Sequence, residues 1–180
     1  LTLGLGLSVT PVQAAASDSA NTIIMDTAYG KVTIRLRPDL APKHVERIKT
    51  LVKEGFYDGI VFHRVIEGFM AQTGCPHGTG TGGSGQKLKA EFNPEPHVRG
   101  TVSMARAQSP DSGDSQFFIC FDDTTLPTDA AGGYSVVGTV TSGLDQLKSQ
   151  IVSGGIAPGA NGPTDGSPVI PTTITAFTLS

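Results

Sequence analysis

One apolar segment of the sequence contains a single arginine, and this combination is the strongest candidate for chemistry in the chain. The segment reads FHRVIEGFMAQTG over residues 62–74, so Arg64 stands in an apolar strand context with Phe69 and Met70 close behind it. An arginine stays protonated and holds its donors in a rigid fork, so it can present one fixed cation beside a shallow apolar pocket. The alternative is structural, with Arg64 in a surface ion pair and Phe69 and Met70 as core filling. This segment alone leaves both interpretations open.

A second set of residues has metal-binding chemistry but a weaker pattern. Cys75 and His77 could supply one sulfur and one nitrogen, with His63 and His97 as the remaining ligands. A structural zinc site needs four ligands at a recognisable spacing, so we expect polar loop histidines, an isolated thiol and no metal site. A disulfide between Cys75 and Cys120 stays open for an oxidising compartment, because the sequence does not show whether their Cα atoms lie within reach.

A glycine-rich run, GTGTGG over residues 78–83, matches the G-x-G-x-x-G fingerprint of dinucleotide sites. A phosphate site of this kind needs a strand before the run and a helix N-terminus directly after it. The residues that follow, Ser84 to Lys87, carry no apolar helical stripe. The run therefore predicts a surface loop without a nucleotide, and no cofactor is expected.

The composition narrows the class of protein. The 180 residues include 13 basic and 16 acidic side chains, a formal net charge of −3, and aromatic residues make up 6% with no Trp. Nucleic-acid binders show a basic stripe or a stacking platform, and neither is visible, so no nucleic-acid partner is expected. The two cysteines exclude a disulfide framework. The apolar content suffices for one sizeable core, which predicts one domain over residues 21–180, an enzyme or a binding module.

Residues 1–20 are set apart from this domain and predict the remnant of a signal peptide with a flexible continuation. Leu1–Ala16 is uncharged, rich in Leu, Gly, Val and Ala, and ends on three small residues. It is too short to span a bilayer as a helix, which takes about 20 apolar residues. The pattern is typical of a secretory leader cleaved near Ala14–Ala15, and predicts a periplasmic or otherwise exported protein with no membrane contact after leader removal. An apolar N-terminal strand or a cloning remnant is the alternative.

The elements that must position Arg64 are mostly short strands. Strand-like runs occupy residues 22–27, 31–36, 60–63, 68–72, 101–105, 116–121, 134–140 and 172–179. One helix begins near Pro42 and ends before Gly55, and a second covers residues 144–152. Because closing a sheet removes its exposed edges, this pattern predicts a mainly β fold, an antiparallel barrel capped by two helices.

Two later segments stand at the order and spacing that one protein family shows. They read SMARA over residues 103–107 and SQFFIC over residues 115–120. Together with FHRVIEGFMAQTG they resemble the cyclophilins, which are peptidyl-prolyl cis-trans isomerases. The resemblance extends from about residue 22 to residue 179 and implies a closed eight-stranded antiparallel β-barrel with two α-helices. It also implies a monomer that accelerates rotation about X–Pro bonds in proline-containing peptides and unfolded proteins, assisting folding without a cofactor.

The resemblance also implies roles for individual residues. Arg64 matches the catalytic arginine of the family. The lining of the proline pocket is matched by Phe69, Met70, Phe118 and Leu126. Positions that bind the peptide backbone are matched by Gln72, Ala105, Arg106 and Gln116. The edge of the site is matched by His63 and Tyr134.

Three of these positions differ from the common family pattern. Arg106 stands where many members carry an Asn, Leu126 where some carry a Trp, and Tyr134 where many carry a His. A short insertion around residues 128–133 lies between the last two. The missing Trp implies weak binding of cyclosporin-type inhibitors and leaves the isomerase reaction intact.

Elementary chemistry makes this set of residues intelligible. Rotation about an X–Pro bond breaks amide resonance over a barrier of ~18–20 kcal/mol, and the prolyl nitrogen of the twisted state becomes a better hydrogen-bond acceptor. A guanidinium aimed at that nitrogen stabilises the twisted state more than either planar isomer.

The alternative function from another class is a proline-peptide binding module or chaperone, which Arg106, Tyr134 and the insertion favour. A metal-dependent hydrolase is a remote third hypothesis.

Overall fold

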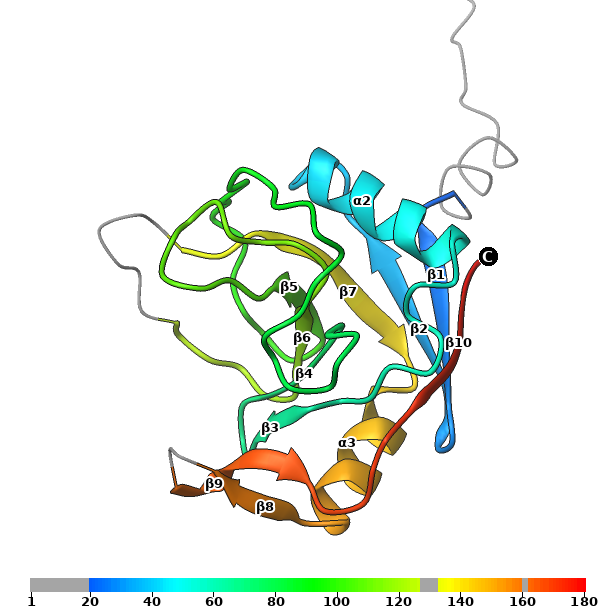
Figure 1. The fold of residues 1–180 in the computed structure, drawn as a ribbon, viewed down its shortest axis with the longest axis vertical. Coiled ribbons are helices and arrows are strands. Elements are labelled where there is room, and N and C mark those ends of the chain that lie inside the picture. The colour runs from blue at the N-terminus through cyan, green and yellow to red at the C-terminus, as the bar shows by residue number, and fades with distance from the viewer. Residues whose placement is uncertain (1–19, 127–132, 160–161) are drawn as a thin grey trace, which may run out of the picture.

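The computed structural model describes residues 20–126, 133–159 and 162–180 of the chain. In these ranges ten strands form a single sheet, accompanied by the helices α2 (Pro42–Lys53) and α3 (Leu144–Ser153) (Figure 1). The predicted mainly β class with two helices is therefore confirmed. The strands are β1 (Thr22–Thr27), β2 (Gly30–Leu36), β3 (Arg64–Ile66), β4 (Met70–Thr73), β5 (Thr101–Met104), β6 (Phe117–Cys120), β7 (Val136–Ser142), β8 (Ile156–Gly159), β9 (Gly162–Pro168) and β10 (Ile174–Leu179).

Two predicted features lie largely outside the described residues. They are the secretory leader, Leu1–Ala16, and all but the end of the insertion around residues 128–133. Among the described residues, no helix is both long enough and apolar enough to cross a membrane.

The prediction of a closed eight-stranded barrel is wrong in its strand count and in its closure. The ten strands follow the order β10-β1-β2-β7-β5-β6-β4-β3-β9-β8, and in the described part of the chain the two end strands do not pair with each other. The reason is that β3 is only three residues long and pairs with β9 along its second edge. The start of β10 and the residues before it instead contact the segment ahead of β3. The contact consists of an isolated bridge between Val61 and Thr173 and backbone hydrogen bonds that join residues 59–62 to residues 172–174. The strand expected at residues 60–63 is reduced to these contacts.

Three of the ten strands lie outside the predicted runs: β3, which directly follows the run expected at residues 60–63, and the hairpin of β8 and β9. Residues 156–168 are rich in Gly and Pro, which have low strand propensity. Their extended conformation comes from pairing, since β8 pairs with β9 and β9 pairs with β3 at Val65 and Ile66. A Cβ atom on Gly166 would collide with the carbonyl oxygen of Ala157, so glycine permits this close approach of the two strands. Figure 1 shows the hairpin at one end of the molecule, beside β3.

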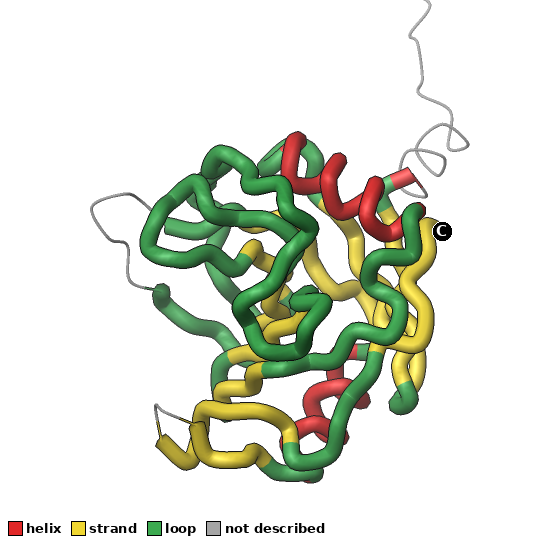
Figure 2. The backbone as a smooth tube through the Cα atoms, viewed as in Figure 1, coloured by secondary structure: helices red, strands yellow, loops and turns green. Residues whose placement is uncertain are grey.

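The strand register separates the two faces of the central sheet. One row of residues stands opposite one another across β3, β4, β6 and β5 and is buried in the main core: Val65, Ala71, Ile119 and Val102. Side chains alternate between the faces along a strand, so the adjacent row points the other way. That row consists of Arg64, Gln72, Phe118 and Ser103. Long loops gather beside these central strands (Figure 2).

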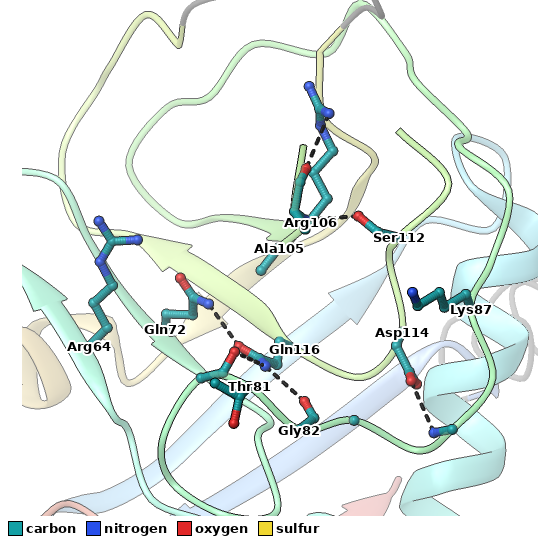
Figure 3. Close-up of a pocket in the computed structure, with 14 residues that line it drawn as sticks. Arg64, Gln72, Thr81, Gly82, Lys87, Ala105, Arg106, Ser112, Asp114 and Gln116 are labelled. Atoms are coloured by element: carbon teal, nitrogen blue, oxygen red, sulfur yellow. Dashed lines mark hydrogen bonds between the residues drawn. The ribbon is translucent and has the colours of Figure 1, made fainter. Parts of the chain in front are cut away.

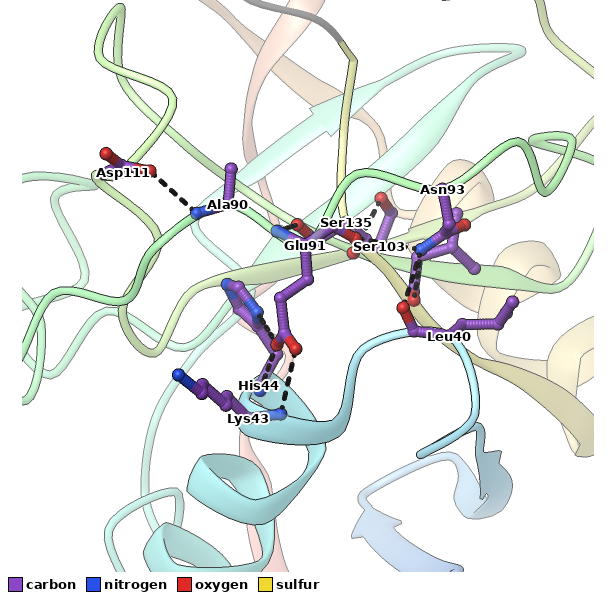
Figure 4. A network of polar contacts seen from close by, with 10 residues as sticks. Leu40, Lys43, His44, Ala90, Glu91, Asn93, Ser103, Asp111 and Ser135 are labelled. Atoms are coloured by element: carbon purple, nitrogen blue, oxygen red, sulfur yellow. Dashed lines mark hydrogen bonds and ion pairs between the residues drawn. The ribbon is translucent and has the colours of Figure 1, made fainter.

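The loop between β4 and β5 is tied to the start of α2 by one carboxylate. Glu91 accepts the backbone N–H groups of Lys43 at 3.2 Å and His44 at 2.8 Å, and its Oε1 lies 2.5 Å from the Nδ1 of His44 (Figure 4). Glu91 thus caps the helix from a distance of 47 residues and pairs with a buried ring. This partner allows the His44 ring to be buried on the helix that the sequence predicts from Pro42.

We expect Glu91→Ala to lower the free energy of unfolding by about 2 kcal/mol, because a buried imidazole and two helix N–H groups lose their acceptor. Burial raises the pKa of Glu91, but the hydrogen bonds from the side chain and backbone of His44 and from the backbone of Lys43 outweigh it, and the pKa lies below its ordinary value. The resulting stability is present above the unfolded pKa and is lost as the pH falls through the folded pKa.

Urea denaturation from about pH 7 down to about pH 3 checks this prediction. The difference between wild type and Glu91→Ala should shrink toward acid. Glu46→Ala, an exposed carboxylate on the same helix, is the matched control and should cost little at any pH. A difference that stays constant over the whole range would contradict the role given to Glu91.

Candidate active site

A second apolar cluster lies apart from the main core, on the face of the sheet that carries Arg64. Its buried members are Met70, Phe118 and Cys120. Partly buried residues pack against them: Ile66, Phe69, Ala105, Leu126 and Tyr134. The structure thus brings together all four residues predicted to line a proline pocket, with Tyr134 at their side. We call these eight residues the Phe118 cluster.

The rings of the Phe118 cluster hold one another in position through aromatic contacts. The Phe69 ring meets Phe118 edge-on at 6.1 Å between centroids, and the Tyr134 ring meets it edge-on at 5.8 Å. His97 stacks on Phe118 at 6.0 Å with an interplanar angle of 17°. Edge-to-face and stacked pairs at these distances are attractive. The cluster therefore offers a preformed apolar wall against which a small ring can rest.

Arg64 is the first residue of β3 and is held by a carboxylate from the hairpin. Its Nε donates to Asp165 Oδ1 at 3.0 Å and its Nη2 to Asp165 Oδ2 at 2.9 Å. The hydrogen bond to Asp165 raises the pKa of Arg64 against an opposing effect of burial, so the guanidinium stays charged. The side chain is 41% exposed. Both interpretations of this arginine therefore hold in part. Arg64 forms a surface ion pair, and that pair lies beside an apolar cluster.

A polar pocket of about 560 Å³ adjoins Arg64 (Figure 3). Its lining includes all of the residues predicted to bind a peptide backbone: Gln72, Ala105, Arg106 and Gln116. The rest of the wall comes from the loops around residues 80–87 and 107–114. Ala105 belongs both to this lining and to the Phe118 cluster, so the polar pocket adjoins the apolar cluster.

Two glutamines hold the pocket and the glycine-rich run together. Gln72 Nε2 donates to Gln116 Oε1 at 2.9 Å, and Gln116 Nε2 donates to the carbonyl oxygens of Gly80 and Gly82 at 2.9 and 2.8 Å. No helix follows the run at residues 78–83. The run is a loop, as predicted, and its carbonyl groups fix the wall of the pocket.

The two cysteines lie in different environments and are both free, so the disulfide that the sequence left open does not form. Burial raises the pKa of Cys75, but the backbone N–H groups of Gly80 and Gly82, each 3.3 Å from its Sγ, help to bring it to about 6. Burial in the Phe118 cluster raises the pKa of Cys120 to about 12. Over the described ranges, no three His, Cys, Asp or Glu residues lie close enough to hold a metal ion.

Arg106 contributes its backbone to the pocket, while its side chain turns away (Figure 3). Nε donates to the carbonyl oxygen of Gly133 at 3.0 Å, and the guanidinium lies 5.3 Å from the centroid of the Tyr134 ring and 5.4 Å from that of Phe92. Such cation–π contacts are attractive. The side chain therefore supports Tyr134, and only the main chain is placed to pair with a peptide.

The two histidines near the site differ in their contacts. The backbone N–H of His63 donates to the carbonyl of Gln72, while both of its ring nitrogens are buried without a hydrogen-bond partner among the described residues. Burial and the charge of Arg64 lower the pKa of His63. His97 Nε2 lies 3.0 Å from Ser103 Oγ, and burial lowers its pKa.

Sequence reasoning missed two residues that complete the site, Asp165 and the stacked His97. Asp165 lies 101 residues from Arg64 in a Gly- and Pro-rich segment, and no sequence signal links the two. His97 was considered only as a candidate metal ligand, and its position next to Phe118 depends on the loop that precedes β5.

Comparison with known proteins assigns the family. The profile described as "Cyclophilin type peptidyl-prolyl cis-trans isomerase/CLD" matches residues 22–176. A Brucella suis protein named "Probable peptidyl-prolyl cis-trans isomerase" is 53% identical over 156 residues, 79% of this chain and 78% of its own. A peptidyl-prolyl cis-trans isomerase of Helicobacter pylori is 49% identical over 129 residues, 68% of this chain and 77% of its own.

Solved structures agree with the sequence relatives. A cyclophilin-type isomerase of Cryptosporidium parvum, crystallised in the presence of the dipeptide Ala-Pro, has a TM-score of 0.75 at 28% identity and covers 88% of this chain and 98% of its own. A cyclophilin of Hirschia baltica has a TM-score of 0.72 at 27% identity, with coverages of 96% and 81%. The chain therefore belongs to the cyclophilin-type peptidyl-prolyl cis-trans isomerases.

Proposed function

We propose that Arg64 and the Phe118 cluster catalyse the rotation of X–Pro bonds in flexible or unfolded protein segments, and so assist folding. The observation that carries the proposal is the register of the central strands. Arg64 stands opposite Gln72, and Gln72 stands opposite Phe118. This arrangement puts a fixed cation, an amide and an aromatic wall side by side on one face.

In the proposed mechanism the pyrrolidine ring rests on the Phe118 cluster and stays still while the preceding carbonyl turns. Gln72 and the backbone of Ala105 hold the flanking peptide, so rotation occurs at one bond. Arg64 donates a hydrogen bond to the prolyl nitrogen as it loses conjugation. Only an interaction that is stronger in the twisted state than in the planar isomers lowers the barrier.

The free energy of one charged hydrogen bond limits the rate acceleration that Arg64 alone can supply. A hydrogen bond from a charged donor is worth about 1.5–3 kcal/mol, and each tenfold of rate needs ~1.4 kcal/mol. Arg64 thus supplies about one to two orders of magnitude of rate. Positioning of the chain and exclusion of water at the apolar wall supply the remainder.

Exchange NMR on a proline tetrapeptide that populates both isomers tests the function without a coupled protease. An isomerase speeds cis-trans exchange at catalytic concentration, whereas the alternative binding module shifts peptide resonances with no change in the exchange rate. The Cryptosporidium parvum relative was crystallised in the presence of Ala-Pro, which favours a short proline peptide as the probe. Binding without acceleration would refute the proposal.

We also propose an exported, periplasmic location and a monomer that binds cyclosporin-type inhibitors weakly. The leader-like composition of Leu1–Ala16 supports export, and Leu126 in the Phe118 cluster, at a position where some relatives carry Trp, supports weak inhibitor binding. N-terminal sequencing of the protein from a periplasmic fraction checks the location. An intact leader on protein recovered from the cytosol would refute it.

A further inference from the structure

We infer that Asp165 is a positioning residue for Arg64, so that the β8–β9 hairpin is a working part of the active site. The inference rests on the proposed function, in which Arg64 reaches the prolyl nitrogen. It adds a residue that lies outside the three motifs carrying the family resemblance, in a segment with no strand signal. The geometry of the pair, the attachment of the hairpin and the exposure of the guanidinium each support it.

The pair has the two-point geometry that fixes a guanidinium. Nε and Nη2 of Arg64 bind the two oxygens of Asp165 at 3.0 and 2.9 Å. A single hydrogen bond would leave the plane of the guanidinium able to rotate, whereas two parallel bonds fix its orientation. Nη1 lies outside this pair, so the pairing leaves donors that can point toward a substrate.

The hairpin is fastened to the chain on both sides of Arg64. Ser167 Oγ donates to the carbonyl oxygen of His63 at 3.1 Å, and the N–H of Glu67 donates to the carbonyl oxygen of Thr164 at 2.9 Å. Asp165 itself stands opposite Ile66 in the β3–β9 ladder. The carboxylate therefore comes from a backbone that is anchored at the residues flanking Arg64, and it cannot drift away from the arginine independently.

The exposures of the two side chains indicate which one serves the other. Asp165 is 13% exposed while Arg64 is 41% exposed, so the carboxylate forms the fixed base and the guanidinium reaches outward. Arg64 and Gln72 line two pockets, the polar pocket described above and a second one of about 400 Å³ on the side of the hairpin. An arginine chain without a partner at this junction would sample many rotamers, and a substrate would have to order it upon binding. The pair orders it in advance, which is the usual origin of preorganised catalysis.

The opposite effect of the same pair would be inhibition, in which Asp165 withholds Arg64 from the substrate. The two effects predict changes of opposite sign. We expect Asp165→Ala to lower the catalysed exchange rate about tenfold at saturating peptide, with peptide affinity changed less than about twofold. Asp165→Glu, which keeps a carboxylate, should recover part of the loss. An Asp165→Ala enzyme that is faster than wild type, or equal to it, would overturn the inference.

A double-mutant cycle distinguishes the positioning role of Asp165 from a purely structural role of the hairpin. In an Arg64→Lys background, Asp165→Ala should change the rate less than about twofold, because an ammonium cannot use the two-point pairing. A tenfold loss in that background as well would mean that Asp165 acts through the fold, and would overturn the inference. The Arg64 Nε–H resonance gives a readout without substrate, and it should be sharp in wild type and broadened by exchange with water in Asp165→Ala.

Asp145→Ala is the matched control, because Asp145 pairs with Arg99 at a second arginine–carboxylate contact on the surface outside both pockets that Arg64 lines. It should leave the exchange rate unchanged. The activities of Arg64→Ala and Asp165→Ala together distinguish the proposed mechanism from the positioning role of Asp165. Full activity in Arg64→Ala would refute the proposed mechanism itself, whereas a loss in Arg64→Ala with wild-type activity in Asp165→Ala would refute only the positioning role.

Discussion

Arg64→Ala is expected to lower kcat/KM for prolyl isomerisation by about 100-fold, because the variant loses the charged donor that reaches the prolyl nitrogen. The fold should survive, since the side chain is 41% exposed and lies on the face opposite the main core. Because Asp165 is only 13% exposed, the loss of its partner should cost about 1–2 kcal/mol of unfolding free energy, which leaves the protein folded. The predicted result is a folded protein with little activity.

Exchange NMR on the same proline peptide measures the activity of Arg64→Ala, and urea denaturation measures its stability. Arg99→Ala is the matched control, because the Arg99 side chain is also 41% exposed and also binds a carboxylate, that of Asp145. It should keep both activity and stability. Near-wild-type turnover in Arg64→Ala would mean that the prolyl nitrogen is stabilised by another group.

Phe118→Ala is expected to lower kcat/KM by about 30-fold, mainly through a higher KM. The ring is 4% exposed and contacts Phe69, Tyr134 and His97, so its loss removes the centre of the wall on which the pyrrolidine would rest. Burying a ring of that size against an apolar wall contributes about 1.5–3 kcal/mol. The variant should also lose about 3 kcal/mol of unfolding free energy, as truncation of a buried aromatic residue does.

The neighbouring residue provides the control for this second prediction. Phe117 is equally buried, but it points into the main core because side chains alternate along β6. Phe117→Ala should cost at least as much stability and leave the kcat/KM of the folded fraction unchanged. The milder pair Phe118→Leu and Phe117→Leu repeats the comparison if either alanine variant unfolds. Equal activity losses at the two positions would show that activity follows stability alone.

Much of the site could be predicted from the sequence, because its residues lie in short contiguous motifs on adjacent strands. FHRVIEGFMAQTG places Arg64, Met70 and Gln72 on β3 and β4, and SQFFIC places Phe118 on β6. The alternation of strand side chains then determines which residues share a face. Helix α2 was predictable for local reasons as well, since Pro42 begins it and Gly55 follows its end with a φ of 72°.

The hairpin and its carboxylate could not be predicted, because they depend on pairing between distant segments. Nothing in residues 156–168 favours strands, and the partner of β9 lies about 100 residues earlier. The closed barrel was predicted wrongly for the same reason, since that prediction took no account of a hairpin pairing with β3. Arg106 shows a third kind of limit, because the sequence could locate its backbone and could not show that its side chain stacks on Tyr134.

The register of the central strands links activity to correct folding. A slip of one residue by β3 and β4 together against β6 would exchange the rows, placing Arg64 and Gln72 in the main core and Val65 and Ala71 on the outer face. Burying an arginine there and exposing the apolar row would destabilise that slipped structure strongly. A population that is folded but misregistered and inactive should therefore not accumulate. The rate of catalysed exchange should then be proportional to the concentration of native protein. During refolding, specific activity should rise in step with the fraction of molecules that has regained its tertiary structure.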